Sequence, residues 1–166
     1  MKFFRIITAV LFAGIAVLTS SAQAATTTQT FNVNLTLTPM CYINLAAGPA
    51  NGTVTDVALS YTAFQATPAQ ANTSFVVKCT NTWPYDVAVS SDTGTVDGIT
   101  YFVKLVAGAS PSYASATGSG SVTGESGDGS TGKTYSVGVQ AASGQPGTCA
   151  TGPCTGSQSH TVTVTF

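Results

Sequence analysis

Within residues 28–39 of the chain, apolar and polar residues alternate strictly from Phe31 to Thr38. The apolar positions are Phe31, Val33, Leu35 and Leu37, and the polar positions between them are Asn32, Asn34, Thr36 and Thr38. Because successive side chains of a β-strand point to opposite faces, the pattern predicts a strand over Phe31–Thr38 with one apolar row. This strand can either open the sheet of its own domain or leave that domain and pair with another subunit.

The residues after the first 24 contain no 11-residue window with a clean helical apolar stripe. Further strands are predicted at Cys41–Leu45, Val57–Tyr61, Ser74–Thr80, Tyr85–Ser90, Ile99–Ala107, Lys133–Ala141 and Ser159–Phe166. They are short, rich in Val, Thr, Tyr and Phe, and separated by residues that favour turns. The sequence therefore predicts an all-β fold, most simply a β-sandwich.

Two regions toward the C-terminus differ in character. Residues from Gly108 to Gly132 are dominated by Gly, Ser, Ala and Thr, which predicts a long connection with a short strand at Ser121–Thr123. The segment Ser159–Phe166 is instead a well-formed strand on which the chain stops. A seven-stranded immunoglobulin-like sandwich normally has one further strand after that point.

The first 24 residues have the features of a cleaved secretory signal peptide. Lys2 and Arg5 precede an apolar run of 13 residues, and Ala22-Gln23-Ala24 has the small-x-small form of a cleavage site. We expect cleavage after Ala24, with Ala22 as the alternative. The apolar run is too short for an ordinary membrane span, and no later segment is long enough. The mature chain is therefore expected to be exported, without a transmembrane span.

Charged residues are scarce in the predicted mature chain, residues 25–166. It contains three lysines and six acidic residues, which give a net charge of −3. Ordinary globular proteins carry charges at about 25% of positions. The surface must therefore consist largely of Thr, Ser, Asn, Gln and Gly. There is no basic patch, so we expect no nucleic-acid binding.

The chain contains four cysteines, Cys41, Cys79, Cys149 and Cys154. An even number behind a secretion signal predicts disulfides, and three pairings are possible. We favour Cys41–Cys79, which attaches the start of the domain to a later strand. The second bond is then Cys149–Cys154, in a short loop that Gly152 and Pro153 allow to turn.

No motif in the sequence indicates an enzyme, a cofactor or a metal site. Residues 127–134 match the nucleotide-binding pattern G-x-x-x-x-G-K-T, but a predicted strand follows where that loop requires a helix. Cys149, Cys154 and His160 could be zinc ligands, but a fourth ligand is lacking and export favours a disulfide. A catalytic triad would need His160, and no serine has the context of a nucleophile.

The order of several segments resembles the spore coat protein U-like domain family, which includes subunits of archaic chaperone–usher pili. The resemblance rests on the alternating strand that leads into Cys41, on residues 76–80 around Cys79, on residues 134–141 and on the alternating end at residues 161–166. Three features depart from the family pattern. The stretch Leu59–Phe64 fits it loosely, and the pair Cys149 and Cys154 is an addition. Residues 158–160 stand where many members have Tyr and Asp before the final strand.

The resemblance implies an incomplete immunoglobulin-like β-sandwich that is completed by a strand from a neighbouring subunit. The implied organisation is a signal peptide at 1–24, a donor-strand extension at 25–39 and a pilin domain at 40–166. Phe31, Val33, Leu35 and Leu37 would be the donor residues, and Val162, Val164 and Phe166 would line the groove that accepts them. The implied partners are neighbouring pilin subunits, a periplasmic chaperone and an outer-membrane usher.

The function implied is that of a structural subunit of a cell-surface pilus, which supports adhesion and biofilm formation. The alternative is a secreted or coat-associated binding module that does not polymerise.

Trp83 and Tyr85, on either side of Pro84, are expected to pack in the core or a turn, or to form a contact surface.

Overall fold

The computed structural model of the chain describes residues 26–45, 49–113 and 120–166. Within these ranges it contains eight β-strands and no helix. The strands are β1 (Cys41–Ile43), β2 (Ala69–Cys79), β3 (Pro84–Val89), β4 (Thr93–Val96), β5 (Ile99–Ala107), β6 (Ser121–Ser126), β7 (Lys133–Ala141) and β8 (Val162–Thr165). The predicted all-β class is therefore confirmed. The predicted signal peptide, residues 1–24, lies outside the described residues.

The chain divides into two units, Met1–Thr36 and Leu37–Phe166. The described part of the first unit, residues 26–36, contains neither a strand nor a helix. The second unit contains all eight strands and is called the β-domain below.

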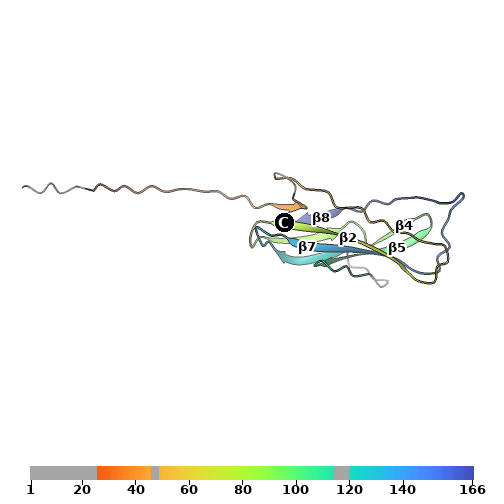
Figure 1. The fold of residues 1–166 in the computed structure, drawn as a ribbon. Coiled ribbons are helices and arrows are strands. Elements are labelled where there is room, and N and C mark those ends of the chain that lie inside the picture. The colour runs from red at the N-terminus through yellow and green to blue at the C-terminus, as the bar shows by residue number, and fades with distance from the viewer. Residues whose placement is uncertain (1–25, 46–48, 114–119) are drawn as a thin grey trace, which may run out of the picture. The chain divides into compact units, whose positions relative to one another are not determined.

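The strands of the β-domain form two antiparallel sheets (Figure 1). The larger sheet has the order β1-β2-β7-β5-β4, and the smaller sheet has the order β6-β3-β8. The longest ladder joins β2 to β7, from Ala69 opposite Ala141 to Val77 opposite Lys133. Because β3, β6 and β8 each follow a strand of the larger sheet, the chain crosses repeatedly between the sheets, as it does in β-sandwiches.

The core lies between the sheets and is made of alternate residues of the strands. It includes Phe75, Val77 and Cys79 of β2, Tyr85 and Val87 of β3, Tyr101, Val103 and Leu105 of β5, and Tyr135, Val137, Val139 and Ala141 of β7. The hydroxyl groups of Tyr85 and Tyr135 are 2.8 Å apart, so a buried hydrogen bond joins the two sheets. Burial raises the pKa of both phenols, so the pair stays neutral.

Most of the predicted strands are present. Ile99–Ala107 and Lys133–Ala141 have the predicted ends and the others have shifted ends, but Val57–Tyr61 was predicted wrongly. It has the alternating burial of a strand, yet no strand of the described chain pairs with it. Phe31–Thr38 also has no strand in this structure. The pattern of side chains predicts which residues can form a strand, whereas a strand also needs a bonded neighbour.

One strand, β4, was not predicted because it is short and contains a glycine, which weakens a strand. Gly94 is required by a close approach, since a Cβ atom at this position would overlap the ring of Tyr101. The short strand predicted at Ser121–Thr123 is present and extends to Ser126 as β6. Residues 114–119 of the same connection lie outside the described residues.

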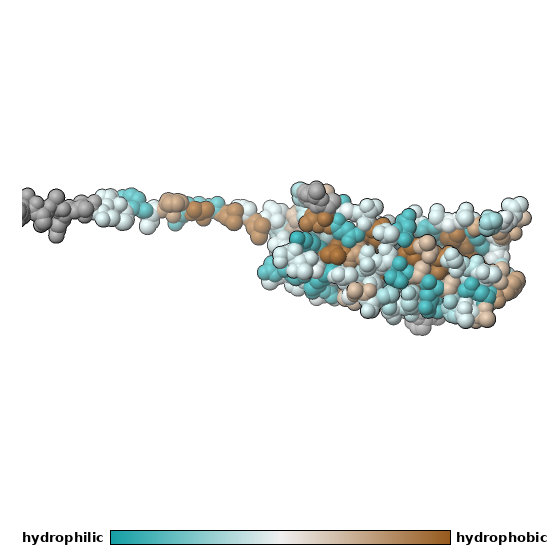
Figure 2. Space-filling view, viewed as in Figure 1, coloured by the Kyte–Doolittle hydropathy of each residue, from teal (hydrophilic) through white to brown (hydrophobic). Residues whose placement is uncertain are grey.

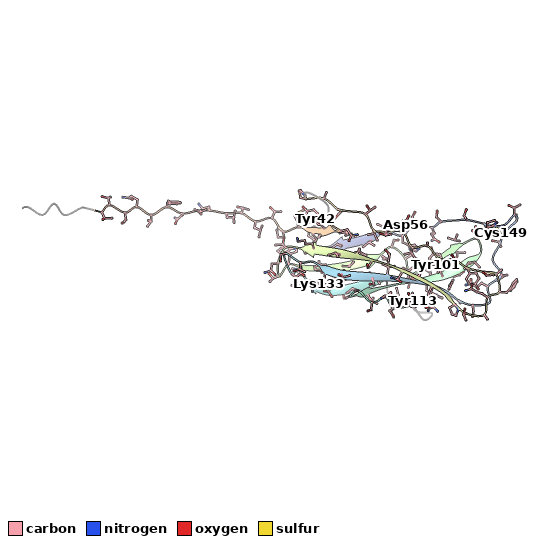
Figure 3. All side chains as sticks on the ribbon, viewed as in Figure 1. Tyr42, Asp56, Tyr101, Tyr113, Lys133 and Cys149 are labelled. Carbon is pink, nitrogen blue, oxygen red and sulfur yellow. A yellow bond between two sulfur atoms is a disulfide. The ribbon has the colours of Figure 1, made fainter. Side chains whose placement is uncertain are left out.

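The β-domain has two ends, which are named here by the register of β2. At the proximal end Cys41 lies opposite Cys79, and at the distal end Ala69 lies opposite Ala141. The ten residue steps of β2 between these ends correspond to about 33 Å. Figure 3 labels Tyr42 at the proximal end.

Both predicted disulfides are confirmed. Cys41–Cys79 joins β1 to β2 across 38 positions of the sequence. Cys149–Cys154 closes a short loop between β7 and β8 across 5 positions. The first bond encloses much more of the chain, so it should restrict the unfolded state more strongly.

We therefore expect the two disulfides to contribute unequally to stability. Replacing Cys41 and Cys79 together by serine should lower the free energy of unfolding by about 4 kcal/mol, and replacing Cys149 and Cys154 by about 2 kcal/mol. Urea denaturation of the two double variants and the parent chain measures both values. An equal loss, or a larger loss for Cys149 and Cys154, would contradict this expectation.

Candidate strand-docking site

The strand β8 has one paired edge and one open edge. It pairs with β3, from Val162 opposite Val89 to Thr165 opposite Asp86, and ends the described order of its sheet. Val162 and Val164, which were predicted to line a groove, are half-buried and pack against the core. The third predicted residue, Phe166, is 52% exposed and lies just beyond β8.

The hydrogen bonds of β8 direct two of its residues toward the open edge. The Ser90 N–H donates to the Thr161 carbonyl over 2.9 Å, so these residues form a hydrogen-bonded pair. Bonded and non-bonded pairs alternate in an antiparallel ladder, so Thr163 also bonds to β3. The N–H and C=O groups of Val162 and Val164 then point away from β3, and no hydrogen bond in the described structure uses them.

A second stretch of backbone without partners follows β1. Within the described chain, no hydrogen bond involves the backbone of residues 54–61. Their apolar side chains, Val54, Val57, Leu59 and Tyr61, are nevertheless half-buried against the core. The Tyr61 hydroxyl accepts a hydrogen bond from the Gln145 N–H over 2.8 Å, which holds the end of the stretch in place. This stretch therefore packs as a strand does, without a ladder.

The open edge of β8 lies on the side of the sandwich where β1 forms the edge of the larger sheet. β8 is close to β1, whereas β6, at the other edge of the smaller sheet, is close to β5. In the view of Figure 2, hydrophobic residues are exposed in a broken line along the length of the β-domain, on the face where Figure 1 labels β8. The half-buried apolar residues of β8 and of residues 54–61 would be covered more fully by one additional strand.

The inward-facing row of Val162 and Val164 continues two residues before β8, to His160. Its Nε2 atom lies 2.9 Å from the hydroxyl of Tyr101, which belongs to the opposite sheet. Its Nδ1 atom is buried and has no hydrogen-bond partner among the described residues. The alternation of His160 with Val162 and Val164 in the sequence is the signal for this inward position.

The apolar residues predicted as donors are largely exposed in this structure. Phe31, Val33, Leu35 and Leu37 are 85, 81, 88 and 71% exposed. Large apolar side chains exposed together in this way usually mark a surface that another molecule covers.

The other motifs considered in the sequence take no part in such a site. Residues 127–132 form the turn between β6 and β7, and residues 133 and 134 begin β7 where a nucleotide-binding loop would need a helix. Lys133 donates to Glu125 over 2.8 Å. This hydrogen bond raises the pKa of Lys133. Cys149 and Cys154 are bonded to each other. In the described parts of the chain, no three His, Cys, Asp or Glu side chains are grouped to hold a metal ion, and no helix could span a membrane.

We expect amide hydrogen exchange to alternate along β8 in a monomeric preparation of the mature chain. The amide of Thr163 is bonded to β3, so it should exchange roughly tenfold more slowly than the amides of Val162 and Val164. Residue-resolved exchange by NMR measures this pattern. Equal protection of all three amides would mean that a strand already covers the edge, and equal rapid exchange would mean that β8 is not formed.

Comparison with protein families identifies one match. The model of the Spore Coat Protein U domain matches residues 27–115, which include the exposed apolar segment and strands β1 to β5. Searches of curated proteins and of solved structures each returned no match. The match covers more than half of the sequence, and the chain belongs to the Spore Coat Protein U domain family.

Proposed function

We propose that this chain is a structural subunit of a cell-surface pilus assembled by the chaperone–usher pathway through donor-strand exchange. Its family includes subunits of chaperone–usher pili. The observation that carries the proposal is the complementarity of two parts of the chain. One is the exposed apolar row at residues 31–37, and the other is the open edge of β8.

The two parts match in length and in chemistry. Residues 31–37 and residues 160–166 each contain seven residues, which span about 23 Å when extended. In a polymer, the four apolar side chains of one subunit cover the half-buried apolar residues of the next. The backbone of the inserted strand pairs with the free N–H and C=O groups of Val162 and Val164.

The expected energy of this contact is sufficient for a stable junction. Burial of one large apolar side chain contributes about 1.5–3 kcal/mol, so four contribute about 6–12 kcal/mol before the cost of ordering the strand. Hydrogen bonds of the added ladder stabilise the junction further. A junction of this kind needs no nucleotide, because completion of the sandwich supplies the free energy.

The partners follow from the hazard that an open edge presents. An unpaired apolar strand edge promotes aggregation, so a newly exported subunit needs a temporary partner. We infer that a periplasmic chaperone supplies a strand, which the next subunit replaces at an outer-membrane usher. Export through an oxidising compartment fits the predicted signal peptide and the two disulfides. The pilus would serve adhesion and biofilm formation, and the proposal assigns the chain no catalytic role and no cofactor.

We expect Leu35→Asp to abolish polymers while leaving the complex with the chaperone intact. The substitution places a charge on the apolar row, where it would be buried without a partner in the neighbour's groove. The matched control is Asn34→Asp, which places the same charge on the opposite face of the same strand. Polymers are detected as a ladder of heat-sensitive multimers on SDS gels of boiled and unboiled samples.

The control variant should give the same ladder as the parent chain. A normal ladder from Leu35→Asp would reject residues 31–37 as the donor strand. A folded parent chain that runs as a monomer in every lane would reject polymerisation and favour the secreted binding module.

A further inference from the structure

We propose that in the polymer the distal turn that carries Phe64 packs against Met40 and Trp83 of the donating subunit. Met40 and Trp83 are called the proximal patch below. The inference rests on the proposed donor-strand polymerisation and adds a second contact between the same two copies of the chain. This contact fixes the orientation of successive subunits, which one inserted strand and a short linker leave free to rotate.

Phe64 is an exposed aromatic residue on a turn that the fold holds firmly. Its side chain is 72% exposed, and its φ of 61° lies in the left-handed region, which bulky residues rarely adopt. The Phe64 N–H donates to the Gln145 carbonyl over 2.9 Å, and the Gln65 N–H donates to the Thr62 carbonyl over 3.0 Å. Strain of this kind persists where the surroundings enforce it, often at functional positions.

The loop that supports this turn is itself anchored at the distal end. The Gln145 side chain accepts from the Thr100 N–H over 2.8 Å and donates to the Thr100 carbonyl over 2.9 Å. Farther along the same loop, the Thr148 N–H donates to the Asp97 carbonyl over 2.7 Å. Figure 3 shows Cys149 of this loop at the end of the β-domain opposite Tyr42. The distal end therefore presents Phe64 on a preorganised surface, which lowers the entropic cost of docking.

The proximal patch is held together by one residue, Thr80. The Thr80 N–H donates to the Met40 carbonyl, and the Trp83 N–H donates to the Thr80 carbonyl, each over 3.0 Å. Met40 is 42% exposed and Trp83 is 39% exposed. Since about 33 Å separates the ends of β2, Phe64 cannot cover the patch of its own domain. The patch is therefore available to another copy.

The direction of the inserted strand decides which ends of two subunits meet. Residues 38–40 join the donor row to β1 and span only about 10 Å, so the donating domain lies beside the point where Leu37 emerges. In an antiparallel insertion, Phe31 lies near Phe166 at the proximal end of the acceptor. Leu37 then lies near His160, toward the distal end, and the donor's proximal patch faces the acceptor's distal turn.

A parallel insertion is incompatible with a long polymer. It would bring the proximal ends of both subunits together, where the acceptor must also pass its own strand to a third copy. Successive subunits would converge on one point, whereas a filament needs a head-to-tail contact between different surfaces. Every strand pair described in the β-domain is also antiparallel.

Trp83 is the single tryptophan of the chain, so its fluorescence reports on the proximal patch directly. We expect acrylamide to quench Trp83 more strongly in polymers of Phe64→Gly than in polymers of the parent chain. Glycine adopts the left-handed φ of position 64 without strain, so the turn itself should persist. The control is Leu45→Ala, which shortens another exposed apolar side chain (40% exposed) that lies just after β1, away from the distal turn. Equal quenching in the parent and Phe64→Gly polymers would overturn the contact.

A cross-linking measurement tests the contact without removing it. A benzophenone amino acid at position 64 should, on illumination of the polymer, cross-link to a peptide that contains Met40 or Trp83 of the next subunit. The same amino acid at position 45 should not. A heat-sensitive ladder without the cross-link from position 64 would overturn the end-to-end contact and leave donor-strand exchange standing. Absence of the ladder from the parent chain would overturn both the end-to-end contact and donor-strand exchange.

Discussion

The open edge of β8 is the constraint on which the rest of the structure depends. Backbone N–H and C=O groups that adjoin an apolar core must be bonded, either to protein or to water. At Val162 and Val164 water can satisfy these groups only while the apolar side chains beside them stay partly wet. A partner must therefore bond these backbone groups and cover the apolar side chains at the same time. Only an extended segment with alternating residues supplies both a ladder and an apolar row.

The two sheets of the β-domain stay packed together despite the open edge of β8, because the main contacts that hold them lie elsewhere in the domain. The long ladders of β2 with β7 and of β7 with β5 form the centre of the larger sheet. The buried hydrogen bond between Tyr85 and Tyr135 connects that centre to β3, and the Cys41–Cys79 bond fixes β1 to β2. The missing strand would therefore be an addition to a formed core. On the proposed function, the domain could therefore accept strands from different partners in the same place.

The sequence predicted the fold class and both disulfides, since period-two alternation and the secreted context are local properties of the chain. It did not predict that Val57–Tyr61 lacks a ladder, because the presence of a neighbour is a property of the folded structure. It missed β4, whose Gly94 makes sense only beside the ring of Tyr101. The predicted strand Ser159–Phe166 includes His160, but its apolar row was predicted to begin at Val162, so the contact of His160 with Tyr101 was not expected. The exposed turn at Phe64 had no signal in the sequence, since its φ is set by distant residues.

The scarcity of charged residues would limit repulsion between subunits in a polymer of identical copies. Each contact in a homopolymer brings together two chains of the same net charge, and like net charges repel. With three lysines and six acidic residues in residues 25–166, few such pairs can arise. The long alternating segment at residues 31–38 contains no charge at all. A surface of Thr, Ser and Asn stays soluble through hydrogen bonds with water, and it remains compatible with repeated self-association. On the proposed function, the composition, the open edge and the two exposed ends would all follow from one requirement, that each subunit pairs with further copies of the same chain.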